Sequence, residues 1–255
     1  MQSKLGAEGL TVIAVTSEPT GPTEKWIAEK GAKYGYAYDK GGKFMRACGV
    51  SGIPHSVLVD VSGKVTFSGS PSAITEDMVK SACAGAMTTP LWELPKPFAK
   101  VRTAIAKGEL AAALKEAQAL QQDATNGETA TKVADAVKGM VAGALSSAEG
   151  LSTAGDFLGA EREFQRLLKA AKGMPEEASA REKLTELTGS PEAKKGMKAQ
   201  KTLESMTAEP VKTKKDAEKR VAELEAFIKK NEGTFAGKQA LEQAEKLKEA
   251  LKKGD

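Results

Sequence analysis

Three side chains are the first candidates for chemistry: the cysteines Cys48 and Cys83, which are the only two in the chain, and its single histidine, His55. Thiolates attack disulfides, so a cysteine is a candidate redox group wherever its thiolate is favoured. Cys48 is the candidate redox thiol. Cys83 is flanked by alanines and is expected in a core, where a free cysteine behaves as a small hydrophobe. A disulfide between them would need Cα atoms within about 7 Å.

The same inventory excludes several kinds of site. One histidine and two cysteines do not supply a zinc site or a histidine-dependent triad, so no metal and no cofactor is expected. The sequence has no phosphate-binding Gly-x-x-x-x-Gly-Lys-Ser/Thr loop, no Gly-x-Gly-x-x-Gly and no Gly-x-Ser-x-Gly. His55 follows Pro54, so it is either adjacent to a site in that loop or a partly exposed loop residue.

Composition excludes two classes of partner. The net charge is only +4 over 255 residues, and the lysine runs 194–195 and 212–215 are interleaved with glutamates, which predicts solvated helix faces and no nucleic-acid binding. No apolar run reaches the roughly 18 residues that span a bilayer. Met1–Gly9 lacks a basic segment followed by an apolar run, so no secretory signal is expected in the sequence as written.

The elements that must position these groups fall into two regions. Residues 1–90 alternate between strand and helix signals, 91–97 form a proline-rich connector expected to be extended, and 98–255 are rich in helix formers. In the first region we expect β-α-β-α-β-β-α order, with strand 10–17 covered on both faces and helix 42–48 presenting Phe44, Met45 and Cys48 to the core. The other expected elements are strands 34–38, 55–61 and 64–68 and helices 23–33 and 75–87.

The second region predicts about six or seven helices, from apolar residues at helical spacing and from glycine and proline breaks. Residues 108–113 (GELAAA) and 155–160 (GDFLGA) share a glycine followed five positions later by alanine. This step resembles that of tetratricopeptide-type repeats, and residues 233–238 echo it in part. We therefore expect stacked, TPR-like helical hairpins.

The most specific string is CGVSGIPHSVLVDVSGKV, residues 48–65. It resembles the second half of a thioredoxin-like domain of the TlpA-like or redoxin group, which is related to AhpC/TSA proteins, and the similarity covers about residues 5–87. The resemblance implies a cis Ile53–Pro54 peptide in a loop that helps to receive substrate.

The chain departs from that group because it contains no Cys-x-x-Cys motif and lacks the group's strand, and most of the helix, before Leu10. In the group this cysteine pair opens the helix that follows a central strand, which would lie between strands 10–17 and 55–61. Without that strand, buried backbone groups would lose partners at about 1–3 kcal/mol each. We therefore expect the chain to be an N-terminally truncated fragment of a longer protein.

The resemblance implies a thiol-disulfide oxidoreductase in its intact form, acting on protein dithiols or disulfides in cell redox homeostasis or antioxidant defence. Like its relatives it would be extracytoplasmic, or periplasmic; otherwise it is cytoplasmic. The 255-residue chain itself should be inactive as a dithiol reductase. Two alternatives stay open: a redox-inactive thioredoxin-fold scaffold whose helical region binds a protein partner, and a peroxiredoxin-like peroxidase.

Overall fold

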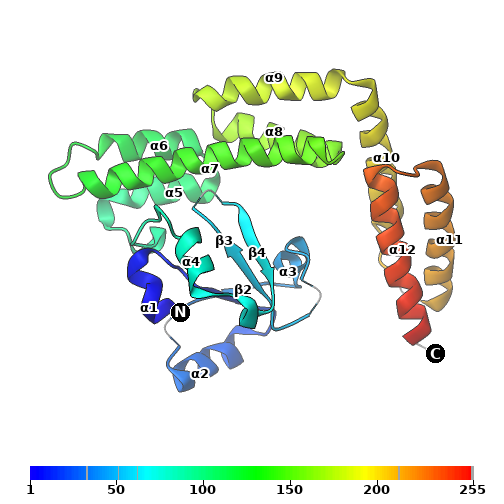
Figure 1. Cartoon of the computed structure of the whole chain (residues 1–255), viewed down its shortest axis with the longest axis horizontal. Coiled ribbons are helices and arrows are strands. Elements are labelled where there is room, and N and C mark those ends of the chain that lie inside the picture. The colour runs from blue at the N-terminus through cyan, green and yellow to red at the C-terminus, as the bar shows by residue number, and fades with distance from the viewer. Residues whose placement is uncertain (33, 51, 62, 212, 254–255) are drawn as a thin grey trace. The chain divides into compact units, whose positions relative to one another are not determined.

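The computed structural model describes residues 1–32, 34–50, 52–61, 63–211 and 213–253. The expectations that involve Lys33, Ser51, Ser62, Lys212, Gly254 and Asp255 lie outside these residues. The chain divides into two compact units, Met1–Gly143 and Ala144–Asp255, and each is described by itself (Figure 1). The predicted domain limits at residues 90 and 97 stay a prediction.

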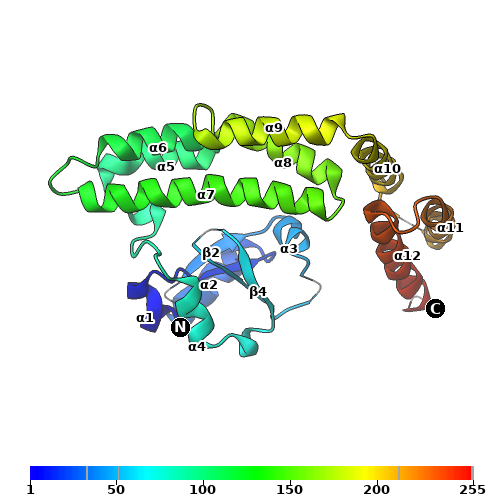
Figure 2. The same ribbon diagram turned by 45° about the horizontal axis from the view of Figure 1, so that its top comes forward.

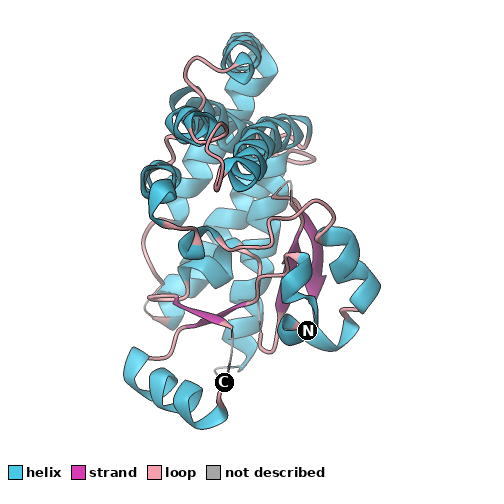
Figure 3. Cartoon of the chain, turned by 90° about the vertical axis from the view of Figure 1, so that its left-hand side faces the viewer, coloured by secondary structure: helices cyan, strands magenta, loops and turns pink. Residues whose placement is uncertain are grey.

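The first unit contains two separate pairs of strands (Figure 3). β1 (Ile13–Thr16) runs parallel to β2 (Gly35–Tyr38), and β3 (Ser56–Val59) runs antiparallel to β4 (Val65–Gly69). All four strands were predicted. β1, β2 and β3 lie within their predicted ranges, whereas β4 runs one residue past its predicted end, to Gly69, which pairs with Ser56. Within the described residues nothing joins the two pairs into one sheet.

Short helices complete this part: one precedes the first strand, and the other three follow the predicted order. They are α1 (Gln2–Leu5), α2 (Thr20–Lys30), α3 (Lys43–Ala47) and α4 (Glu76–Ala82). Leu5, Leu58, Val79 and Ala82 form a small buried cluster that joins α1, β3 and α4. Phe44, predicted to face a core, is instead 56% exposed. The reason is that α3 is only five residues long and is fixed at its start by Asp39, whose carboxylate accepts hydrogen bonds from Phe44 N and Met45 N at 3.0 Å.

A larger core lies where the chain becomes helical. α5 (Ala99–Lys107), α6 (Leu110–Ala119) and the first part of α7 (Gly127–Thr153) lie side by side (Figures 1 and 2) around Phe98, Val101 and Val137. Residues 91–97 are not extended as expected, because Leu91–Glu93 and Lys96–Phe98 form turns of 3-10 helix. The Arg102 guanidinium donates to the Leu94 carbonyl, and Leu94 and Phe98 are buried against α5–α7, which explains the compact turns.

The second unit is built from helical pairs. α8 (Phe157–Ala170) packs on α9 (Pro175–Gly189), α11 (Lys214–Lys230) packs on α12 (Phe235–Lys253), and α10 (Pro191–Thr207) contacts α8, α9 and α12. The described part of the chain therefore holds eight α-helices from Ala99 onward, one more than the sequence predicts. The predicted junction at Gly108 ends α5 with a left-handed φ of 74°.

The two predicted helix junctions have the same local structure. Gly155, like Gly108, has a positive φ, and the alanines five positions later, Ala113 and Ala160, are fully buried. Such a glycine allows the chain to reverse, and the small alanine allows close helix contact. The TPR-like character of the region stays a prediction.

Candidate functional site

The loop before β3 carries the residues that the sequence singles out. The Ile53–Pro54 peptide is cis, which is the conformation that the resemblance implies. Ile53 is 82% exposed, and so is available for contact with another molecule. His55 Nε2 is hydrogen-bonded to Ser68 Oγ on β4 at 2.9 Å, which ties the end of the loop to the hairpin.

The two cysteines are free thiols, and the structure does not pair them. Cys48 is half-buried at the end of α3, where its N–H donates to the Phe44 carbonyl at 2.9 Å. Cys83 ends α4 and packs against the cluster of Leu5, Leu58, Val79 and Ala82, as its predicted core role requires. Burial raises the pKa of the Cys83 thiol, and the nearby Glu8 carboxylate raises it further, so its reactive thiolate form is disfavoured.

One edge of β1 has no strand beside it in the described structure. The carbonyls of Val12 and Thr16 accept hydrogen bonds from Gly35 N and Asp39 N, so the even-numbered residues of β1 direct their backbone groups toward β2. Backbone groups alternate along a strand, so those of Ile13 and Val15 face the opposite edge. Ile13 is 49% exposed, and strand 10–17 is therefore not covered on both faces as predicted.

The Gln2 side chain binds the backbone just before β1, at groups that are not bonded to β2. The Gln2 carboxamide donates to the Leu10 carbonyl at 3.1 Å and accepts from Val12 N at 2.7 Å. Leu10 also packs against the cluster that β3 and α4 share. The beginning of β1 therefore lies beside the core under β3, although the two strands are not paired. Val59 and Val61, at the end of β3, are about half exposed.

An aromatic group covers β2, and the sequence analysis did not identify it. Tyr34 and Tyr36 are stacked with ring centroids 5.2 Å apart, and Trp26 from α2 meets Tyr36 edge-on at 6.5 Å. Burial, with a smaller effect of Tyr34, raises the pKa of Tyr36 to about 12, so this phenol stays protonated. The i, i+2 spacing of the two tyrosines, which puts them on one face of an extended chain, is the signal that could have revealed the stack.

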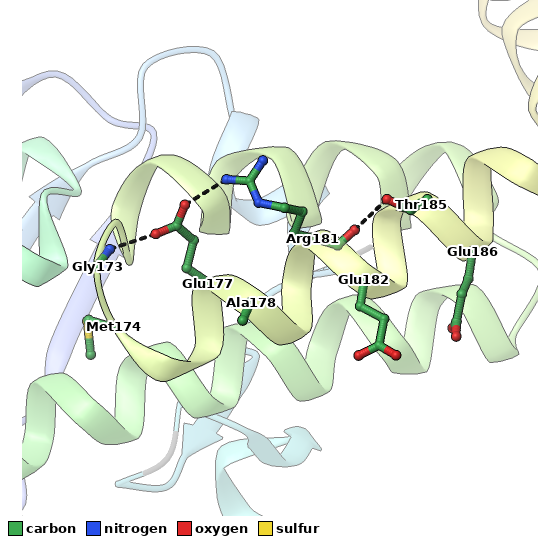
Figure 4. Close-up of a pocket in the computed structure, with 8 residues that line it drawn as sticks. All are labelled: Gly173, Met174, Glu177, Ala178, Arg181, Glu182, Thr185 and Glu186. Atoms are coloured by element: carbon green, nitrogen blue, oxygen red, sulfur yellow. Dashed lines mark hydrogen bonds and ion pairs between the residues drawn. The ribbon is translucent and has the colours of Figure 1, made fainter.

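The second unit carries an open groove of about 700 Å³ along α9 (Figure 4). Two of its three carboxylates have partners: Glu177 accepts hydrogen bonds of 2.7 Å from both Gly173 N and the Arg181 guanidinium. Glu186, at the other end, accepts from Lys183 at 3.2 Å. These contacts stabilise α9, and the lining as a whole has three carboxylates against one guanidinium.

The described residues offer neither a metal-binding cluster nor a membrane-spanning helix. They contain no group of three or more histidine, cysteine, aspartate or glutamate side chains arranged to hold a metal ion. None of their helices combines the length and the apolar character needed to cross a bilayer.

Comparison with known proteins supports the predicted redoxin-like domain in the first region. Residues 1–84 match the model of the Redoxin family. No curated protein and no solved structure matches the chain. The matched segment includes both strand pairs, the Ile53–Pro54 loop and both cysteines, and the predominantly helical remainder lies outside it. Residues 1–84 are therefore a redoxin domain, thioredoxin-like and related to AhpC/TSA proteins.

Proposed function

We propose that this domain belongs to a thiol-disulfide oxidoreductase of the TlpA-like type, which exchanges electrons with protein dithiols and disulfides outside the cytoplasm. The supporting observation is the redoxin match together with two strand pairs that lack a common neighbour. In the reductive direction, a thiolate attacks one sulfur of a substrate disulfide and releases the other as a thiolate. A second thiol then resolves the mixed disulfide, so the substrate gains two electrons and the enzyme dithiol becomes a disulfide.

The two cysteines present are poor candidates for that dithiol. They do not form a Cys-x-x-Cys motif, and the pKa of Cys83 is raised, whereas an attacking thiol needs a favoured thiolate. We assign the dithiol to a strand and helix that would pair with β1 and β3 and that the described residues do not supply. On this proposal the chain as given is one part of a longer protein.

The loop residues have defined parts in this proposal. Ile53 and Pro54 would contact the extended substrate chain next to the dithiol, since Ile53 is 82% exposed and Pro54 is also exposed. His55, held by Ser68, would line the same loop. Cys48 would have a supporting redox role at most, because it is a single thiol at the end of a short helix.

Insulin reduction tests this proposal. The 255-residue chain, and its Cys48→Ser and Cys83→Ser variants, should show no dithiol-dependent reduction. The protein isolated from its source with an antibody to the helical region should be active and should contain two further alkylatable thiols. Activity of the 255-residue chain that survives removal of both cysteines contradicts the assignment, as does a source protein with only two thiols.

A second candidate is a redox-inactive scaffold with a protein-binding helical region. It is favoured by the two unpaired thiols and by the open grooves of the second unit. An isolated source protein that has two thiols, reduces neither insulin nor peroxide and retains a partner through residues 144–255 supports it. Consumption of hydrogen peroxide by that source protein would instead support the peroxiredoxin-like alternative.

A further inference from the structure

A second groove in the helical unit has a different charge pattern from the first. It is open, has a volume of about 560 Å³, and lies along α10 where this helix packs on α8 and α9. Lys194, Lys198 and Lys201 line it from α10, and Glu161 from α8 contributes the one carboxylate among its lining residues. The excess of two positive charges distinguishes this groove from the groove along α9, whose lining has three carboxylates and one guanidinium.

The three lysines present their charges to the same place. Their positions i, i+4 and i+7 put them on one face of α10, and all three are exposed. Within the described part of the chain, no carboxylate lies within 4.0 Å of their ammonium groups, whereas Lys183, Lys219 and Lys248 of the same unit have ion-pair partners.

The acidic residue three positions after Lys201 is already bound to another partner. The Glu204 carboxylate accepts two hydrogen bonds of 2.7 Å from the Arg162 guanidinium on α8. This bidentate pair lowers the pKa of Glu204, with a minor effect of Lys201, and it leaves the lysine charges available to a ligand.

The walls of the groove are fixed before anything binds. Gln200, which is 4% exposed, bonds Asp156 Oδ1 at 2.6 Å and accepts from Leu158 N at 3.0 Å, which links α10 to the start of α8. The Arg162–Glu204 pair makes a second link between the same helices. A preformed groove spares a ligand the entropy cost of ordering it.

We propose that this groove binds an acidic, extended segment of a partner protein. The helical rise of about 1.5 Å per residue separates Lys194 from Lys198 by about 6 Å along the axis, close to the spacing of about 6.7 Å between alternate side chains of an extended peptide. Met197, 7% exposed, gives the floor an apolar patch for a side chain between two acidic ones.

A nucleic acid fits the groove less well than an acidic peptide does. None of the lining residues is aromatic, so bases have no stacking surface, and Glu161 would lie against a continuous phosphate backbone. This proposal goes beyond the redox function and does not depend on it, because every residue involved lies within 156–207.

Fluorescence anisotropy on the full chain tests the proposal, with a fluorescein-labelled nonapeptide of alternating aspartate and alanine around a central leucine as the probe. The triple variant Lys194→Gln, Lys198→Gln, Lys201→Gln should bind it about tenfold or more weakly. The matched control is Lys195→Gln, Lys238→Gln, Lys246→Gln, which removes the same charge from exposed positions outside the groove and should bind normally. Glu161→Gln should tighten binding by removing the one repulsive charge.

The outcomes separate the candidate ligands. Specific binding requires that the asparagine version of the peptide binds weakly and that lysine-to-arginine replacements at the three positions restore binding. Equal binding by the groove and control variants overturns the proposal. Single-stranded DNA that binds the groove in preference to the peptide overturns it as well, in favour of a nucleic-acid ligand. Neither result bears on insulin reduction, so the redox proposal is judged separately.

Discussion

Gln200 Nε2 donates a hydrogen bond of 2.6 Å to Asp156 Oδ1, across 44 positions of the sequence. The same Asp156 oxygen accepts from Gly159 N at 3.0 Å and so caps α8. One buried carboxamide therefore fixes the start of one helix against the middle of another, and the lysine groove depends on that link.

Replacing Gln200 with alanine should lower the free energy of unfolding of the second unit by about 1–3 kcal/mol, because Leu158 N and Asp156 lose a partner in a buried position. Urea unfolding followed by circular dichroism measures this. The control is Gln165→Ala on the exposed face of α8, which should change stability little. Equal effects of the two substitutions would show that the buried link contributes nothing particular.

Two glycines of helices in this unit should respond to alanine in opposite directions. A Cβ at Gly196 on α10 would overlap the ring of Phe157, so Gly196→Ala should destabilise the α8–α10 contact by about 1–3 kcal/mol. A Cβ at Gly150 on α7 meets nothing within 4 Å, so Gly150→Ala should stabilise the chain by up to about 1 kcal/mol through helix propensity. Thermal unfolding of the two variants compares the signs directly, and a shared sign contradicts the packing argument.

The order of strands and helices in residues 1–90 was predictable because each element has a local signal, such as the run from Leu10 to Ser17. The burial of individual side chains was not predictable, because it depends on neighbours outside the element. Ile13 was expected inside a sheet and is half exposed, since one edge of β1 has no partner among the described residues. Phe44 is exposed for a related reason: a helix of five residues, fixed by Asp39, has little surface to pack.

The candidate sites, too, could be predicted only in part from the sequence. Ile53, Pro54 and His55 were identified from one contiguous string. The lysine groove could not be identified from the sequence, although Lys194, Lys198 and Lys201 have helical spacing. From the sequence their glutamate neighbours suggest a neutralised, solvated face. Only the packing of α10 against α8 shows that Glu204 is taken by Arg162 and that Lys195 points elsewhere.

The contact between α1 and α4 should be sensitive to acid. Lys4 and Lys80 both bind Glu76, at 2.5 and 2.9 Å, and lower its pKa from 4.5 to about 2. Because the folded pKa is depressed, the ionised form stabilises the fold above pH 4.5, and this contribution is lost as the pH falls toward about 2. Fluorescence reports on this unit alone, since both tryptophans, Trp26 and Trp92, lie in it.

Glu76→Gln provides the comparison. Wild type should be the more stable protein near neutral pH, and the two unfolding curves should converge as the pH approaches 2. Asp77→Asn serves as the control, because Asp77 is on the same helical turn and has no ion pair in the described structure. A stability difference between wild type and Glu76→Gln that is independent of pH contradicts the ion-pair explanation.

The thiols should differ in reactivity. The Cys48→Ser variant leaves Cys83 as the only thiol, and it should react with Ellman's reagent at pH 8 several-fold more slowly than free cysteine, because burial and Glu8 raise its pKa. Adding Glu8→Gln removes one of the two causes and should accelerate the reaction, with burial unchanged. The Cys83→Ser variant isolates Cys48, which is at the end of a surface helix and should react faster. If Cys83 were the faster thiol and insensitive to Glu8, its assignment to the core would be wrong, and Cys83 would replace Cys48 as the candidate redox group of this chain.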